Sequence, residues 1–300
     1  MRVLCATDLS PLCEFAVDRA GLLAEALGAD LSLLHVVPPV QSERALEQSL
    51  KEAIDYMRAR GREPMWRWGV APNVIVRTGA PARIISETVQ RLTPHVLILG
   101  ARKRGGLCSA LEGSIADRVL RAQTCPVLIV RNAPNAAYQN VVLALDTSER
   151  SVAALQFAER LVVRPDSVAR VIHAYEPPYR GMLRFADIDQ LDVRSYLNAW
   201  RHEARIALRD FLKSFSTDFS RYEIQVEDHK PAASILQSVE RDRPDLLVLG
   251  TRASGSIHRA FTGSVARDVV EHVKCDVLVV PSGQVSASSQ SVSRFTGTSG

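Results

Sequence analysis

The chain repeats itself at the scale of a whole domain. Residues 2–10 (RVLCATDLS) match residues 140–148 (NVVLALDTS), with an aspartate and a serine at the same places. A longer match joins residues 95–130 to residues 245–280, where each copy has an apolar run, a glycine-containing loop and a second apolar run. This period is far longer than a solenoid repeat, so we expect each copy to be a complete domain and both to share one fold.

The two copies differ in length at one place. Asp8 and Asp146 are 138 residues apart, whereas Gly100 and Gly250 are 150 residues apart. The second copy therefore contains about twelve additional residues, which we assign to residues 177–196. Because length variation concentrates in surface connections, we expect this segment to form a loop or lid.

Short apolar runs alternate with amphipathic stretches along each copy. A run such as Val3–Ala6 is typical of a strand buried on both faces, and Ser10-Pro11 is typical of a helix start. We expect strands at residues 3–6, 31–37, 74–76, 96–99 and 127–130, and near 141–144, 168–174, 222–226, 246–249 and 277–280. The alternation predicts an α/β fold of two similar Rossmann-like doubly wound domains, each a five-stranded parallel sheet with helices on both faces.

Polar connecting stretches predict where the domains begin and end. We expect a first domain over residues 1–133, a linker over 134–139, a second domain over 140–282 and a disordered, serine-rich tail over 283–300.

Composition excludes several classes of protein. Of the 300 residues, 46% are hydrophobic and 23% are charged, which is typical of a folded soluble protein. The net charge of +4 is small for an extended nucleic-acid surface, and no apolar stretch approaches the roughly 20 residues of a membrane span. A signal peptide is not expected, and five cysteines without a C-x-x-C pair indicate a reducing compartment. We therefore expect a cytoplasmic protein without a membrane or nucleic-acid partner.

The strongest functional signal is a glycine-containing loop between the fourth strand and the next helix. Gly100 ends the expected strand, and Gly113-Ser114 opens the helix about a dozen residues later. Exposed backbone N–H groups, a hydroxyl and the positive end of a helix together suit an anion such as phosphate. Taken alone, the glycine could be only a turn and the serine only a helix cap. The arrangement recurs, however, and so favours a phosphate-bearing ligand in at least one copy; its second occurrence is at Gly250, Gly263 and Ser264.

Charge and position add to this signal. Arg102 and Lys103 bring positive charge to the first loop, and Arg252 brings it to the second. Asp8 and the turn at Gly79 follow strand ends, as the glycine-containing loop does. In doubly wound sheets such positions converge at the switch point in strand order, where ligands bind. We therefore expect one crevice in each copy.

Both copies resemble the universal stress protein domain over nearly all of residues 1–282. Nucleotide-binding members of that family carry G-x2-G-x9-G-[ST] in this loop, an aspartate after the first strand near the nucleoside, and backbone after the second strand against adenine. The cofactor that the resemblance implies is ATP or another adenine nucleotide, with or without Mg²⁺. This sequence departs from the motif at its middle glycine, which is Lys103 in the first copy and Ala253 in the second. The implied contact positions are Asp8, Val36, Gly100, Gly113 and Ser114 in the first copy, and Asp146, Ala174, Gly250, Gly263 and Ser264 in the second.

No catalytic residue and no metal site is assigned. Asp8 and Asp146 have no second acid that recurs beside them, so we expect each to position ligand or to cap backbone. His35 and His173 align at the ends of the second strands and are interpreted as hydrogen-bonded histidines of the core or rim. No zinc spacing, nucleophile elbow or Walker lysine motif occurs in the sequence. Whether the chain is an enzyme is left open, and any ATP hydrolysis should be slow.

The resemblance predicts a cytosolic stress-response protein that binds an adenine nucleotide in at least one copy, with occupancy modulating its protein interactions. Two alternatives are an interaction scaffold whose nucleotide pockets are degenerate, and an adenine-nucleotide α-hydrolase, for which Asp8–Pro11 lacks the required Ser-Gly-Gly loop. The protein partners are not specified by the sequence. The resemblance also implies an intramolecular pseudo-dimer in which Val127–Val130 meets Val277–Val280, and it leaves a further homodimer open.

Overall fold

The computed structural model describes residues 1–39, 42–60, 69–101, 114–122, 125–162, 167–178, 190–251 and 264–282. The first copy, hereafter the first repeat, contains β1 (Arg2–Thr7), α1 (Pro11–Leu27), β2 (Asp30–Val37), α2 (Glu43–Arg60), β3 (Asn73–Thr78), α3 (Pro81–Leu92), β4 (Val96–Gly100), α4 (Ile115–Ala122) and β5 (Val127–Val130). The second repeat contains β6 (Asn140–Ala144), α5 (Glu149–Leu161), β7 (Val168–Ala174), α6 (Gln190–Phe215), β8 (Tyr222–Glu227), α7 (Pro231–Asp242), β9 (Leu246–Thr251), α8 (Ser264–His272) and β10 (Asp276–Pro281).

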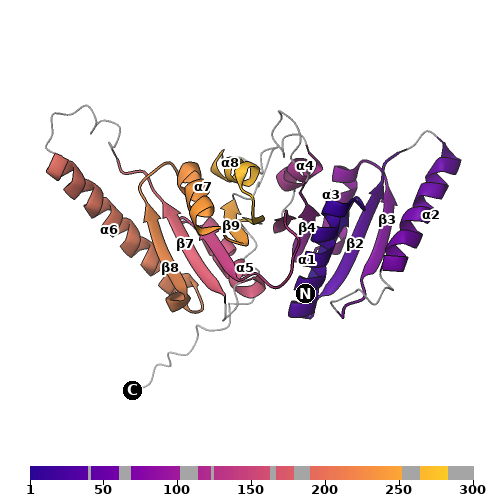
Figure 1. The fold of residues 1–300 in the computed structure, drawn as a ribbon, viewed down its shortest axis with the longest axis horizontal. Helices are drawn as coiled ribbons and strands as arrows, with labels where there is room; N and C mark the ends of the chain where they lie inside the picture. The colour runs from indigo at the N-terminus through magenta and orange to yellow at the C-terminus, as the bar shows by residue number, and fades with distance from the viewer. Residues whose placement is uncertain are drawn as a thin grey trace, which may run out of the picture.

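The described strands form a single ten-stranded sheet in which each repeat supplies one half (Figure 1). The order is β3-β2-β1-β4-β5-β10-β9-β6-β7-β8, and neighbouring strands within each half are parallel. Buried residues of α1, α2, α5 and α6 join one core cluster, and those of α3, α4, α7 and α8 join another, so helices cover both faces. The predicted fold of two doubly wound, five-stranded units is therefore confirmed.

The two halves meet through their last strands. β5 pairs antiparallel with β10, with Leu128 opposite Leu278 and Val127 opposite Val279. The expected contact between these strands is confirmed. Because each strand covers the open edge of the other, the outer strands of the continuous sheet are β3 and β8.

Local sequence signals explain where α1 begins and ends. Ser10 is extended, its hydroxyl accepts a hydrogen bond from the backbone N–H of Cys13 at 3.4 Å, and Pro11 occupies the first helical position. Gly28 ends the helix with a φ of 55°, in the left-handed region that glycine adopts without a steric penalty. The helix start at Ser10-Pro11 was read correctly from the sequence.

The structure corrects the expected loop at residues 177–196. Residues 190–196 form the first part of α6, which has 26 residues where α2 of the first repeat has 18. The sequence indicates this longer helix through the spacing of Val193, Leu197 and Trp200, because apolar residues three and four apart share one helix face. Residues 179–189 lie outside the described part of the chain, as does the expected tail over 283–300. Within the described ranges, no helix is both long enough and apolar enough to cross a membrane.

The segment that connects β5 to β6 contacts both repeats. Tyr138 and Asp276 are buried, and the Tyr138 hydroxyl donates to Asp276 Oδ2 at 2.7 Å. The backbone N–H groups of Arg131 and Asn132 donate to Asp276 Oδ1 at 2.8 and 3.2 Å. Arg19 of α1 lies with its guanidinium carbon 3.8 Å from the centre of the Tyr138 ring. The polar connection expected over 134–139 therefore contains a buried anchor.

Candidate functional site

A pocket of about 380 Å³ opens at the switch point of the second repeat. The strand order reverses between β6 and β9, and residues at the ends of these two strands line the pocket together with the end of β7 and the starts of α5, α7 and α8. Doubly wound sheets bind ligands at this position, because the connections on either side of the switch point run in opposite directions and leave a crevice. Its volume lies within the range of roughly 300–1,000 Å³ that is typical of small-molecule sites.

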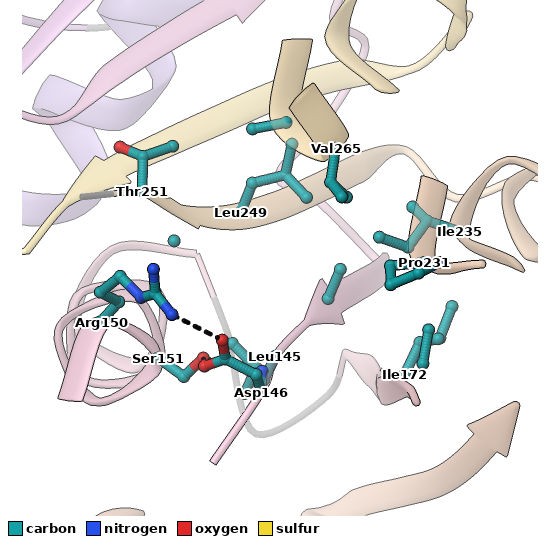
Figure 2. A pocket seen from close by; sticks show the side chains of 14 residues that line it. Leu145, Asp146, Arg150, Ser151, Ile172, Pro231, Ile235, Leu249, Thr251 and Val265 are labelled. Carbon is teal, nitrogen blue, oxygen red and sulfur yellow. Dashed lines mark hydrogen bonds and ion pairs between the residues drawn. The ribbon is translucent and has the colours of Figure 1, made fainter. Parts of the chain in front are cut away.

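The pocket has two chemically different ends (Figure 2). Asp146, Arg150 and Ser151 lie together at one end, with Thr251 above them in this view. The opposite end is apolar, and there the lining side chains are those of Ile172, Pro231, Ile235 and Val265.

Asp146 is held by the first turn of α5. Its Oδ1 accepts hydrogen bonds from the Ser148 backbone N–H at 3.0 Å, from the Ser151 hydroxyl at 2.7 Å and from the Ser148 hydroxyl. Its Oδ2 lies 3.3 Å from Nη2 of Arg150. Burial alone raises the pKa of Asp146, but the hydrogen bonds from Ser148 and Ser151 and the charge of Arg150 together outweigh it and hold the pKa below 3.8. The carboxylate is therefore ionised at neutral pH and can only accept hydrogen bonds.

The corresponding site of the first repeat keeps the carboxylate but lacks the arginine. Asp8 accepts the backbone N–H of Ser10 at 2.9 Å, and hydrogen bonds to Asp8 outweigh its burial and lower its pKa as well. Cys13 occupies the place of Ser151, and Leu12 occupies the place of Arg150. The two repeats thus share an acidic group at the switch point and differ in the cation beside it.

The glycines at the ends of β4 and β9 are required by the helix that packs on them. A Cβ on Gly100 would lie 2.7 Å from Sγ of Cys13 and 3.1 Å from its Cα, and a Cβ on Gly250 would lie 3.0 Å from the carbonyl oxygen of Arg150. Real Cβ atoms essentially never lie as close as 2.7 Å to another atom, and contacts of 3.0–3.1 Å are tighter than most, so α1 and α5 would have to shift to pack against alanine at these positions. The family resemblance implies that these glycines contact ligand, and the packing of the helix is a second reason for glycine at both positions.

The structure brings three of the predicted second-repeat residues around one pocket: Asp146, Ala174 and Gly250 all line it. In the first repeat, Val36 is buried at the end of β2, and the hydroxyl of Ser114 accepts the backbone N–H of Asp117 at 3.1 Å as a helix cap. Ser264 is the first residue of α8. The other predicted positions lie outside the described residues, and these are Arg102, Lys103, Gly113, Arg252 and Gly263, together with the motif position Ala253.

Sequence reasoning did not identify several lining residues. Arg150 and Ser151 follow Asp146 by four and five residues and lie in the first turn of the helix that starts after it, so their closeness along the chain was a usable signal. Ile172 precedes Ala174 by two residues on β7, so it shares that strand's face. Pro231 and Ile235 come from a distant helix, and only the tertiary structure brings them here.

The two aligned histidines make backbone hydrogen bonds. Nδ1 of His35 lies 2.9 Å from the carbonyl oxygen of Thr7, and Nδ1 of His173 lies 2.9 Å from that of Leu145. Since a carbonyl can only accept, each Nδ1 carries the proton. This confirms their interpretation as hydrogen-bonded rim histidines. Among the described residues, no three His, Cys, Asp or Glu side chains are grouped to hold a metal ion.

Comparison with known proteins agrees with this architecture. Universal stress protein Mb2019 of Mycobacterium bovis is 24% identical over 307 residues, covering 92% of this chain and 94% of that protein. Universal stress protein YxiE of Bacillus subtilis is 29% identical over 146 residues, covering 43% of this chain and 98% of that protein. The crystal structure of a universal stress protein from Archaeoglobus fulgidus matches with a TM-score of 0.71 at 18% identity, covering 94% of this chain and 98% of that one. The sequence profile of the universal stress protein family matches residues 1–131 and 137–281, and the chain therefore belongs to that family.

Proposed function

We propose that the pocket of the second repeat binds an adenine nucleotide of the ATP or AMP class, and that its occupancy changes how this cytoplasmic stress-response protein contacts its partners. The observation that carries the proposal is the division of the pocket into an apolar end and a charged end. A nucleotide has the same division, because its base is flat and largely apolar on its faces whereas its sugar and phosphates are hydroxylated and anionic. Pockets of this kind use apolar walls for affinity and a few polar groups for orientation.

The apolar end suits the base. Ile172, Pro231 and Ile235 supply side chains that can contact the faces of a ring. The carbonyl of Ile172 accepts the N–H of Leu145 at 3.0 Å, so it faces β6. Ala174 lies two residues further along β7 and directs its backbone groups to the same side, past the last residue of β6. These groups can hydrogen-bond with the edge of adenine, as the family resemblance implies.

The charged end suits the sugar and phosphates. The ionised Asp146 accepts hydrogen bonds from sugar hydroxyls, and Thr251 offers a hydroxyl beside it. The start of α8 at Ser264 supplies backbone N–H groups and a positive helix end for phosphate. The proposal extends to Arg252 and Gly263 of the preceding loop, and to the equivalent positions of the first repeat. Since Asp146 is the single carboxylate among the described lining residues, a Mg²⁺ would be held mainly by the phosphates.

Isoleucine methyl NMR on the full chain tests the proposal in each repeat separately. Ile235 lines the pocket of the second repeat, and Ile85 is its sequence counterpart in the first. Saturable shifts of the Ile235 methyl during titration with ATP or AMP would support binding in the second repeat, and shifts of the Ile85 methyl would show binding in the first. The control is Ile206, which is exposed on α6 and does not line the pocket.

Two results would contradict the proposal. If neither Ile235 nor Ile85 responds to millimolar ATP or AMP, the scaffold with degenerate pockets is favoured instead. If the Ile235 methyl responds equally to ATP and to GTP, the pocket binds nucleotides but does not select adenine. The role of occupancy is tested by comparing the proteins captured from a lysate by the chain with and without ATP.

A further inference from the structure

We propose that Arg150 is an anion-binding residue of the second repeat: it pairs with Asp146 in the free protein and transfers to a phosphate of the bound nucleotide, which makes the pocket select phosphorylated nucleosides over nucleosides. This inference rests on the function proposed above and names the residue that sets its specificity.

The Asp146 carboxylate has one saturated oxygen and one loosely occupied oxygen. Oδ1 accepts three hydrogen bonds, from the Ser148 N–H, the Ser148 hydroxyl and the Ser151 hydroxyl. Among the described residues, Oδ2 has a single partner, which is Nη2 of Arg150 at 3.3 Å. Charge-assisted N–H···O bonds are normally about 2.7–2.9 Å long, so this contact is weak. A sugar hydroxyl that approaches Asp146 would therefore bind at Oδ2 and compete with Arg150.

The guanidinium of Arg150 makes only weak contacts, whereas the backbone of Arg150 is closely packed. Its Nε donates to the Ser148 hydroxyl at 3.2 Å, and among the described residues its Nη1 has no hydrogen-bond acceptor. Its side chain is 32% exposed and that of Asp146 is 49% exposed, and a pair this accessible to water shifts an equilibrium by roughly fivefold at most. The backbone, in contrast, packs against Gly250 at the pocket wall. The guanidinium can thus leave Asp146 at little cost while remaining at the pocket.

The first repeat shows that the aspartate does not need the arginine to be held in place. Asp8 accepts the Ser10 N–H at 2.9 Å, nearly the same contact as the 3.0 Å bond from the Ser148 N–H to Asp146. The residue aligned with Arg150 is Leu12, which has no charge. Positioning the carboxylate therefore does not explain Arg150. A planar guanidinium with unused donors at a nucleotide-sized pocket is instead suited to a phosphate oxygen pair.

The test compares AMP with adenosine, which differ only by the phosphate. Titrations of the full chain, followed at the Ile235 methyl, should give an affinity for AMP about 10- to 150-fold higher than for adenosine, the range expected for a hydrogen bond to a charged group. Arg150→Leu, which installs the residue of the first repeat, should reduce AMP affinity by about 10-fold or more and change adenosine affinity less than about fivefold. Arg150→Gln serves as a second variant if the leucine variant folds poorly. The matched control is Arg160→Leu, on the same helix and outside the pocket, which should leave both affinities unchanged.

Each other result overturns the inference in a distinct way. If wild-type protein binds AMP and adenosine equally, Arg150 does not recognise phosphate, although nucleoside binding in the pocket would stand. If Arg150→Leu weakens both ligands equally, Arg150 acts only by positioning Asp146. If neither ligand moves the Ile235 methyl, the function proposed for this pocket is itself refuted and the inference falls with it.

Discussion

Replacing Tyr138 by phenylalanine should lower the free energy of unfolding by about 2 kcal/mol. The Tyr138 hydroxyl donates to the Asp276 carboxylate at 2.7 Å, and the two residues are only 2% and 1% exposed. A hydrogen bond to a charged group contributes about 1.5–3 kcal/mol. Phenylalanine keeps the ring beneath the Arg19 guanidinium, so the substitution removes this hydrogen bond and little else.

The pH dependence of this loss follows from the titration of Asp276. Burial raises the pKa of Asp276 above 3.8, while hydrogen bonds from Arg131 and Tyr138 act in the opposite direction. The Tyr138 bond favours the ionised carboxylate, so its removal raises that pKa further. The destabilisation is therefore greatest above the pKa of Asp276 in the folded protein and shrinks as the pH falls through it.

Asp276→Asn provides the comparison that identifies the mechanism. It removes the charge opposite Arg19, which is only 6% exposed and has its Nε 3.8 Å from Asp276 Oδ2. Breaking a buried ion pair from one side costs about 3–5 kcal/mol, because the remaining charge stays buried without compensation. Asp276→Asn should therefore destabilise the chain more than Tyr138→Phe does.

Urea denaturation followed by circular dichroism at pH 7 measures both losses. Tyr56→Phe is the matched control, because the Tyr56 hydroxyl also donates to a carboxylate, that of Glu14 at 3.2 Å, but at an exposed site. It should change the free energy of unfolding by less than about 0.5 kcal/mol. The reasoning is wrong if Tyr138→Phe is as mild as Tyr56→Phe, or as costly as Asp276→Asn.

Two further predictions concern packing and protonation. Gly100→Ala should cost about 1–3 kcal/mol, because the added methyl would lie 2.7 Å from Cys13 Sγ. Adding Cys13→Ala should recover part of that loss, and strictly additive losses in a double-mutant cycle would contradict the steric explanation. For His95, burial, the N-terminal amine and the charge of Arg2 hold the pKa below 6.5. The unfolded chain therefore binds the proton first, and stability is lost as the pH falls from 6.5 through the lower pKa of the folded protein. His95→Asn should remove this part of the pH dependence of the free energy of unfolding. If urea denaturation shows that the free energies of wild type and variant change in parallel between about pH 7.5 and 5, His95 makes no such contribution.

The elements that depend on local patterns were predictable from the sequence. The helix start expected at Ser10-Pro11 and the strand expected at Val127–Val130 are observed at those residues, because capping residues and apolar runs act within a few positions of the chain. The start of α6 was missed because the sequence comparison treated the extra length of the second repeat as loop, although Val193 and Leu197 follow a helical period. Length alone does not distinguish an insertion that extends a helix from one that forms a loop.

The candidate site was predictable in part. Asp146 and Gly250 were identified because each follows or ends a strand, and parallel strands end at one edge of a sheet, whereas Ala174 was implied by the family resemblance. Pro231 and Ile235 were not, because their contact with the pocket depends on how α7 packs over the sheet. The buried contact of Tyr138 with Asp276 joins residues 138 positions apart, and no local pattern marks it.

The sequence by itself determined that two copies of one α/β unit exist, where most of their strands and helices lie, and which strand ends carry an acidic residue and a glycine. These properties follow from period, composition and turn chemistry, which act over short distances along the chain. Only the tertiary structure decided that Ile235 of α7 lines the pocket of the second repeat, that Gly100 lies against Cys13, and that a buried tyrosine anchors the connection between repeats. Those properties depend on which surfaces are packed together and deprived of water, and packing joins residues that the sequence keeps far apart.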